Sequence, residues 1–185
     1  SDRQAHDATI ATTRPMTQLV PQALGGVQRW PAPVATCVQR LLDAGAEVYA
    51  VGGAVRDALL GRASRDWDVA TPAPPSVVAA CFEGATSVDL TLGAVHLDLE
   101  DGYEITFTTF RRDAEYRDRR HPSRVEFVGS LAEDALRRDF TCNAIYVDAR
   151  DGLGLGRREA WRFGCARRRG YRVRVRRLHW SRRRP

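Results

Sequence analysis

Residues 47–70 read EVYAVGGAVRDALLGRASRDWDVA, and the elements that they predict indicate the fold class. Its first part is rich in β-branched and aromatic side chains, which predicts a short strand over residues 47–51. A glycine pair breaks that strand, residues 55–60 read as a helix, and residues 66–70 read as a second strand. A strand, a glycine turn, a helix and another strand in succession indicate a mixed α/β domain.

The sequence on both sides extends this domain. Helical spacing of apolar residues and period-two alternation, separated by turn signals, predict further elements. Helices are expected at 33–44, 76–82 and 131–137, and strands at 95–99, 103–110 and 145–147. Ser130 and Glu133 fit a capping box at the start of the third helix. Residues 111–124 are mostly charged and hold no aliphatic core residue, which predicts a mobile surface loop.

The glycine pair Gly52-Gly53 lies between a strand and a helix. Glycine lets the backbone approach a ligand closely, and the helix start offers unpaired N–H groups to an anion. Arg56 lies in the first turn, where its guanidinium can add charge-assisted contacts to phosphate. Taken alone, this pattern fits a tight turn equally well.

Two carboxylates, Asp66 and Asp68, follow on the second strand. Side chains two residues apart on a strand share one face, so these carboxylates repel unless a cation lies between them. Mg²⁺ prefers oxygen ligands and accepts substrate phosphates in its shell. A solvated edge strand is the alternative, but the glycine pair just before it favours a metal-dependent phosphoryl or nucleotidyl transfer site.

The third candidate is the run Arg137-Arg138-Asp139. Two arginines at a helix end beside an acid form either a structural salt bridge or a site for a nucleotide's phosphate or sugar. The residues of this run leave both interpretations open.

Together, four runs resemble the head domain of the CCA-adding tRNA nucleotidyltransferase and bacterial poly(A) polymerase family, within the DNA polymerase β nucleotidyltransferase superfamily. They are VGGAVRDALLG (51–61), RDWDVAT (65–71), TTFRRDAEYRDRRHP (108–122) and RRDFTCNA (137–144). The resemblance covers roughly residues 47–152. It implies an α/β (α+β) head domain with a mixed, mostly antiparallel sheet flanked by helices.

The resemblance also implies a reaction. In this family a 3′-hydroxyl at the 3′ end of tRNA attacks the α-phosphate of CTP or ATP without a nucleic-acid template, with Mg²⁺ as cofactor and pyrophosphate as leaving group. A poly(A) polymerase and an enzyme that adds only A or only CC are alternatives within the family. A non-catalytic RNA-binding fragment is the alternative from another class.

The residue roles follow from the matched positions. The resemblance assigns nucleotide binding to Gly52, Gly53, Arg56, Arg138 and Asp139, and metal binding and catalysis to Asp66 and Asp68. It expects a third acid near Glu104, which lies two residues before the family position that Thr106 takes. An even offset keeps the same strand face, so Glu104 is retained as a candidate catalytic residue. Residues 111–122 match a flexible loop used in nucleotide switching.

Charge is divided unevenly along the chain. Residues 1–152 hold 16 Arg and 22 acidic residues, whereas residues 153–185 hold 13 Arg and one Glu. We expect a loose leader over 1–30, a head domain over 31–152, and an Arg-rich tail over 153–185 that forms no folded domain. The tail is either a basic RNA-binding arm or the product of a shifted reading frame, and the abrupt loss of acids and of family pattern favours the shift.

The remaining composition points away from membranes and disulfides. No run of 18 apolar residues is present, so we expect no membrane span. The cysteines, Cys37, Cys81, Cys142 and Cys165, are scattered without metal-ligand spacing, which favours small core residues in a reducing cytoplasm.

Overall fold

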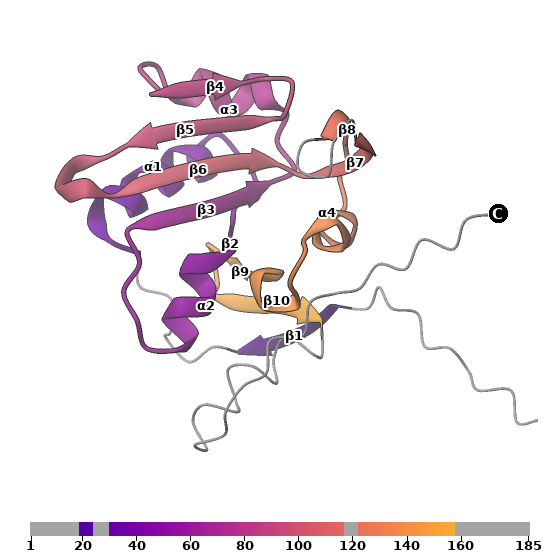
Figure 1. Cartoon of the computed structure of the whole chain (residues 1–185). Helices are drawn as coiled ribbons and strands as arrows, with labels where there is room; N and C mark the ends of the chain where they lie inside the picture. The colour runs from indigo at the N-terminus through magenta and orange to yellow at the C-terminus, as the bar shows by residue number, and fades with distance from the viewer. Residues whose placement is uncertain (1–18, 24–29, 117–121, 158–185) are drawn as a thin grey trace, which may run out of the picture.

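The computed structural model describes residues 19–23, 30–116 and 122–157 (Figure 1). The elements in chain order are β1 (Leu19–Ala23), α1 (Ala32–Asp43), β2 (Tyr49–Val51), α2 (Gly53–Leu59), β3 (Asp66–Thr71), α3 (Pro75–Cys81), β4 (Ser87–Asp89), β5 (Ala94–Asp98), η1 (Glu100–Gly102), β6 (Glu104–Thr109), β7 (Arg111–Tyr116), β8 (Pro122–Phe127), α4 (Leu131–Arg137), η2 (Thr141–Asn143), β9 (Ile145–Asp148) and β10 (Leu153–Arg157).

Most of the strands form one sheet in the order β1-β10-β9-β2-β3-β6-β5-β4, while β7 and β8 form a separate hairpin. Among the described strands, β3 and β6 form the parallel pair and the other pairings are antiparallel. The expected mixed, mostly antiparallel sheet is confirmed.

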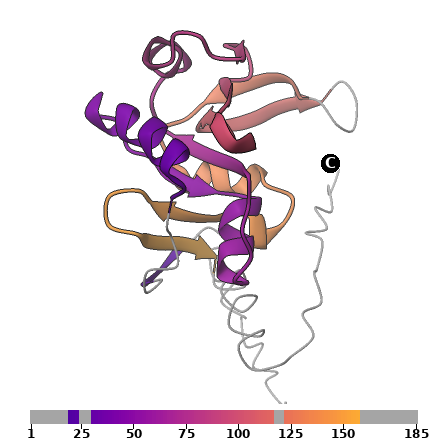
Figure 2. The same ribbon diagram turned by 90° about the vertical axis from the view of Figure 1, so that its left-hand side faces the viewer.

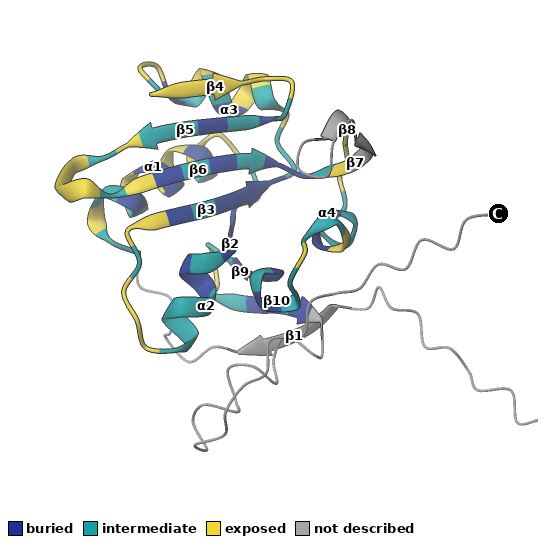
Figure 3. Ribbon diagram, viewed as in Figure 1, coloured by how far each residue is buried: buried dark blue, intermediate teal, exposed yellow. Residues whose placement is uncertain are grey.

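Helices cover both faces of this sheet. In Figures 1 and 2, α1 and α3 lie on one face, whereas α4 and the η2 turn lie on the other. The first face buries a large apolar cluster in which Val34 and Leu41 of α1 and Val78 of α3 meet Val69 and Phe107 of the central strands. The middle of the sheet is accordingly dark in the burial view of Figure 3, and its outer strand β4 is exposed.

A second, smaller cluster lies on the opposite face. Tyr49, Phe110 and Tyr146 pack ring against ring there, and Ala135 of α4 closes over them. The sheet is therefore covered on both faces in its centre. This second face also carries the polar side chains of the candidate site.

Apolar periodicity explains the elements that were expected. In α1, the buried residues Val34, Cys37, Val38 and Leu41 follow helical spacing, and a proline lies in the first turn. Trp67, which strand alternation places on the face opposite Asp66 and Asp68, is 4% exposed and packs on Trp30 with ring centroids 5.1 Å apart.

Two local expectations are wrong. In the expected surface loop 111–124, residues 111–116 form β7 and residues 122–124 begin β8, which runs on to Phe127. Arg112 pairs across this hairpin with Glu126 at 2.7 Å and with Glu133 of α4 at 3.2 Å. Cross-strand charge pairs stabilise a hairpin that has no apolar alternation. The expected capping box also fails, since Ser130 makes no side-chain cap hydrogen bond.

The sheet continues on both sides of the limits expected for the head domain, residues 31 and 152. β10 pairs with β9, and β1 in turn pairs with β10. The expected leader before residue 19 and the arginine-rich segment after residue 157, including Cys165, lie outside the described residues. Of the described cysteines, Cys37 and Cys142 are buried and Cys81 is half-buried; all are free thiols, as expected of core residues.

Candidate nucleotide and metal site

Gly52 sits at the end of β2 and directly faces Asp68. Its φ is +80°, and a Cβ on this residue would lie 2.4 Å from Oδ2 of Asp68. A side chain at this position would thus meet both a backbone penalty and a clash. Glycine here lets the backbone at the start of α2 approach the Asp68 carboxylate closely.

Arg56 of α2 is held in a fixed orientation. Its Nε and Nη2 donate to the Asp57 carboxylate at 3.0 and 3.1 Å, and its Nη1 donates to Oδ1 of Asn143 at 2.9 Å. The guanidinium also lies beside Gly53, where an added Cβ would be 3.5 Å from Nη2. The run after the glycine pair and the run 137–144 therefore meet at Arg56.

Asp66 and Asp68 lie on one face of β3, as strand alternation predicted. Asp66 is exposed and Asp68 is half-buried, while Trp67 between them points into the opposite core. The parallel register places Glu104 opposite Asp66 and Thr106 opposite Asp68. All four side chains consequently belong to the same face of the sheet.

Thr106, the residue of β6 opposite Asp68, is hydrogen-bonded to a histidine. Thr106 Oγ1 lies 2.9 Å from Nδ1 of His96, whose Nε2 lies 3.2 Å from Oδ1 of Asp98. Within the described residues, no group of three or more His, Cys, Asp or Glu side chains is arranged to hold a metal ion. The structure therefore brings Asp66 and Asp68 together, but it does not add Glu104 to them as a third ligand.

Electrostatics at Asp68 favour a bound cation. Burial raises the pKa of its carboxyl above the ordinary value, and the charge of Asp66 adds to this rise. The guanidinium groups of Arg138 and Arg137 oppose the rise, so both arginines lie within electrostatic reach of the pair. A partly desolvated carboxylate beside a second carboxylate is stabilised in its charged form by a positive ligand.

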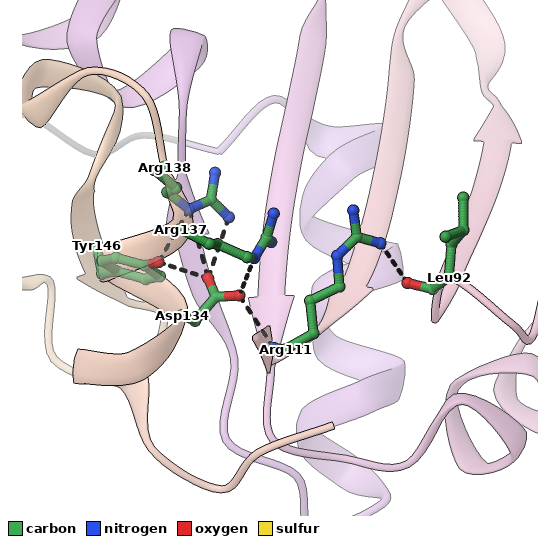
Figure 4. Close-up of polar contacts among 6 residues, drawn as sticks. All are labelled: Leu92, Arg111, Asp134, Arg137, Arg138 and Tyr146. Carbon is green, nitrogen blue, oxygen red and sulfur yellow. Dashed lines mark hydrogen bonds and ion pairs between the residues drawn. The ribbon is translucent and has the colours of Figure 1, made fainter. Parts of the chain in front are cut away.

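The two arginines of the run 137–139 converge on a buried carboxylate that the sequence did not single out. Arg137 Nε donates to Oδ1 of Asp134 at 2.7 Å, and Arg138 Nη2 lies 3.3 Å from Oδ2 (Figure 4). Both arginines of this run therefore form salt bridges, with Asp134 of α4 rather than with the adjacent Asp139. Asp139 is exposed and follows α4.

Three residues of the site region were missed from sequence: Asp134, Asn143 and Tyr146. Asp134 could have been found from the sequence, because it precedes Arg137 by three residues and Arg138 by four, and both spacings allow salt bridges on a helix. Asn143 lies 87 positions from its partner Arg56, and no local pattern connects them. Tyr146 reads from sequence as one more apolar strand residue, although its hydroxyl is bound to Asp134 at 2.5 Å.

No helix in the described part of the chain is both long and apolar enough to cross a membrane.

Comparison with known proteins identifies a family and several relatives of this chain. The family described as "Poly A polymerase head domain" matches residues 48–154. The CCA-adding enzyme of Streptococcus pyogenes is 49% identical over 109 residues, which are 59% of this chain and 27% of that enzyme. The CCA-adding enzyme of Bacillus pumilus is 48% identical over 108 residues, with 58% and 27% coverage. The chain thus spans about a quarter of the length of these curated relatives.

A solved structure shares both fold and sequence. The Bacillus stearothermophilus CCA-adding enzyme in complex with CTP superimposes with a TM-score of 0.58 at 37% identity, covering 75% of this chain and 31% of that enzyme. The matched family spans more than half of the chain and includes the glycine turn, both strand carboxylates and the paired arginines. The chain therefore belongs to the poly(A) polymerase head domain family.

Proposed function

We propose that this chain is the nucleotidyltransferase head of an enzyme that adds nucleotides from CTP and ATP to the 3′ end of tRNA. The observation that carries the proposal is the meeting of three separate sequence runs at one place. Gly52 lies so close to Asp68 that a Cβ would clash with its carboxylate, Arg138 acts electrostatically on Asp68, and Asn143 accepts a hydrogen bond from Arg56. Relatives named CCA-adding enzymes support the choice of reaction.

The donor set fits Mg²⁺. The fit rests on two carboxylates on the same face of β3, one exposed and one partly desolvated, with two arginines within electrostatic reach of the buried one. Mg²⁺ is commonly bound by one or two carboxylates together with substrate phosphates, so a third protein acid is not required. Asp66 and Asp68 would hold the ion, which would supply charge neutralisation for the triphosphate and the attacking oxygen.

The remaining residues bind and orient the nucleotide. We assign the triphosphate to the backbone of Gly52 and Gly53 and to the Arg56 guanidinium, which Asp57 and Asn143 keep in one orientation. Arg138 contacts the nucleotide, and Asp139 lies on its ribose side. In the reaction, the 3′-oxygen forms a bond to the α-phosphorus, the bond from that phosphorus to the bridging oxygen breaks, and pyrophosphate leaves.

The rest of the reaction belongs to the full-length protein. We infer a head domain over residues 31–152, extended by β1 and β10, that acts together with segments holding the tRNA in the cytoplasm. Alone, the chain should bind MgATP and MgCTP weakly and with little preference between the bases. Titration calorimetry of this chain with both nucleotides measures this directly, and strong discrimination between them would contradict it.

A chimera tests the reaction itself. Residues 48–154 replace the matching head of the Streptococcus pyogenes CCA-adding enzyme, and the product is assayed on labelled tRNA that lacks its CCA end. We expect addition of CCA by the chimera, and a rate lower by roughly 10²–10³ after Asp66→Asn or Asp68→Asn. Glu104→Gln is the companion variant: a loss equal to that of the Asp variants identifies it as the third acid. A run of added A residues instead of CCA would identify a poly(A) polymerase head.

A further inference from the structure

Asp134 is the most completely buried charged side chain near the site, at 0% exposure. Five donor groups contact its two oxygens (Figure 4). Oδ1 accepts from Arg137 Nε at 2.7 Å and from the backbone N–H of Arg111 at 3.2 Å. Oδ2 accepts from the Tyr146 hydroxyl at 2.5 Å and from Arg138 Nε and Nη2 at 3.4 and 3.3 Å. One carboxylate thus ties α4, β7 and β9 together.

The same carboxylate and its tyrosine partner fix Arg138. Tyr146 donates its proton to Asp134 and accepts from Arg138 Nε at 2.9 Å. The guanidinium carbon also lies 5.4 Å from the centroid of the Tyr146 ring, a cation–π contact. The Arg138 side chain is only 14% exposed. Arginine is otherwise a side chain with high rotamer freedom, so contacts on Nε, on Nη2 and on its face hold it in one rotamer.

The orientation leaves one part of the guanidinium available. Within the described residues, the hydrogen bonds of Arg138 use Nε and Nη2, whereas Nη1 makes none. The positive charge of this arginine pair is also only partly neutralised. Asp134 neutralises one of the two arginines that it binds, and both arginines act on Asp68 of the candidate site. If Asp134 served only to neutralise a buried guanidinium, one arginine would be enough; the second arginine leaves a net positive charge beside Asp68.

We propose that Asp134 and Tyr146 are positioning residues that hold the Arg138 guanidinium in the orientation in which Nη1 meets the nucleotide. The inference rests on the proposed function, because it takes from there the contact between Arg138 and the nucleotide. Preorganised charged donors bind more tightly than mobile ones, since less freedom is lost on binding. The effect therefore acts on nucleotide affinity through Arg138 and not on stability alone.

The central variant is Tyr146→Phe, which keeps the ring and removes the hydroxyl. Tyr49→Phe is its matched control, because Tyr49 lies in the same aromatic cluster and bonds Glu47 at 2.8 Å instead of the Asp134 network. Asp134→Asn is the stronger variant and is used only if circular dichroism shows that it folds. Each is titrated with MgATP, alone and combined with Arg138→Lys.

We expect Tyr146→Phe to weaken MgATP binding about tenfold, which corresponds to one hydrogen bond to a charged group. Tyr49→Phe should leave binding unchanged. In the Arg138→Lys background, Tyr146→Phe should have no further effect, because a residue that acts through Arg138 loses its influence once Arg138 is replaced. A purely structural residue would instead give additive losses.

A nucleotide-free measurement separates the two proposals. The ¹H–¹⁵N signal of Arg138 Nε, assigned by its loss in Arg138→Lys, should exchange slowly with water in the unaltered chain and in Tyr49→Phe, and quickly in Tyr146→Phe. Additive losses, or an unchanged affinity in Tyr146→Phe while Arg138→Lys still weakens binding, overturn the positioning role and leave the proposed function intact. An Arg138→Lys variant with full MgATP affinity overturns both.

Discussion

At the scale of single residues, Asp68 serves the site at the expense of the fold. Because burial raises the pKa of its carboxyl, the ionised side chain is less stable in the folded chain than in the unfolded chain. The penalty is fully present above the raised pKa, and it disappears as the pH falls below the ordinary value of 3.8. A residue that weakens the fold but carries the proposed metal marks the place where function, not stability, selects the side chain.

Asp68→Asn should therefore raise Tm at pH 7 and weaken Mg²⁺-dependent nucleotide binding about tenfold or more. The gain in Tm should shrink as the pH is lowered through the raised pKa of Asp68 and should vanish below the ordinary value of 3.8, where the carboxyl is protonated in both the folded and the unfolded chain. Asp66→Asn is the control, since it removes the same charge from an exposed position; it should share the binding loss but give a smaller stability gain, because it relieves only the charge repulsion at Asp68 and not its burial. Calorimetric melting at several pH values checks the first effect; a lower Tm in Asp68→Asn at pH 7 would contradict it.

Gly52 offers a second residue-scale prediction. Gly52→Ala places a Cβ at positive φ and 2.4 Å from the Asp68 carboxylate, so it should cost both stability and nucleotide affinity. Gly61→Ala is matched to it, with φ +70° and nothing within 4 Å of the added Cβ. That control should lose about 1–2 kcal/mol of unfolding free energy from the backbone alone and keep its MgATP affinity. Denaturant melts and titration of both variants measure the difference, and equal effects in the two would rule out the contact with Asp68 as the reason for glycine.

At the scale of elements, what the sequence predicts depends on what stabilises each element. α1 and β3 were predictable, since their own side chains repeat with the period of the structure that buries them. β7 and β8 were not, because an ion pair across the hairpin and a second one to α4 replace the apolar pattern that normally signals strands. β10, with the sequence LGLGR, becomes a strand only through pairing with β9 and β1, which no local pattern reveals.

The residues of the candidate site likewise fall into those that the sequence predicts and those that it does not. Gly52 and Asp68 were predicted from spacing along neighbouring elements, and the structure places them next to each other. The supporting residues Asn143 and Tyr146 depend on contacts between distant segments, and a residue's partner across the fold is not encoded in its neighbours. Sequence thus indicates which groups carry charge for the chemistry, but not which groups orient them.

Helix α4 yields the element-scale prediction. Burial alone would raise the pKa of Asp134, but the charges of Arg138 and Arg137 and the hydrogen bonds from Tyr146 and Arg137 lower it below the ordinary 3.8. Its contribution to stability is therefore present above pH 3.8 and is lost as the pH falls through the lower, folded-state pKa. Asp134→Asn should lower the unfolding free energy by about 3 kcal/mol at pH 7, because it leaves buried guanidinium groups unpaired.

The adjacent Glu133→Gln is its control. Glu133 pairs with Arg112 at the surface, so this variant should melt close to the unaltered chain. Denaturant unfolding at pH 7 and in the acid range measures both. A loss in Asp134→Asn that stays constant down to the lowest pH would show that the carboxylate charge is not the source of the stability.

At the scale of the whole molecule, charge is separated along the chain. Residues 158–185 contain twelve Arg and one Glu, while the acidic residues belong almost entirely to the preceding part. If this segment binds RNA, it does so through phosphates, and each contact on a single strand should contribute about −0.7 to the slope of log K against log salt. The slope therefore measures how many phosphates this segment contacts, independently of the head domain.

Deleting residues 158–185 should flatten that slope by several units. The cut belongs after Arg157, because removal of Leu153–Arg157 would also take away β10 and leave β9 without a neighbour on that side. Binding of a labelled single-stranded RNA over a range of salt concentrations measures the slope for both chains. An unchanged slope would show that the segment makes no phosphate contacts, as expected of a tail from a shifted reading frame.

The antiparallel pairing of β1 with β10 brings the first and last strands of the sheet side by side, with Leu19 opposite Arg157 and Ala23 opposite Leu153. A short linker from Arg157 to Leu19 could therefore close the domain into a ring, and new termini could be opened elsewhere, as in a circular permutant. The exposed turn at Gly84 follows α3, outside the runs that form the candidate site, and an added Cβ would meet nothing within 4 Å there, so it offers such an opening. The head could then be inserted as a cassette into a loop of another protein, with both of its connections leaving from the same edge of the sheet.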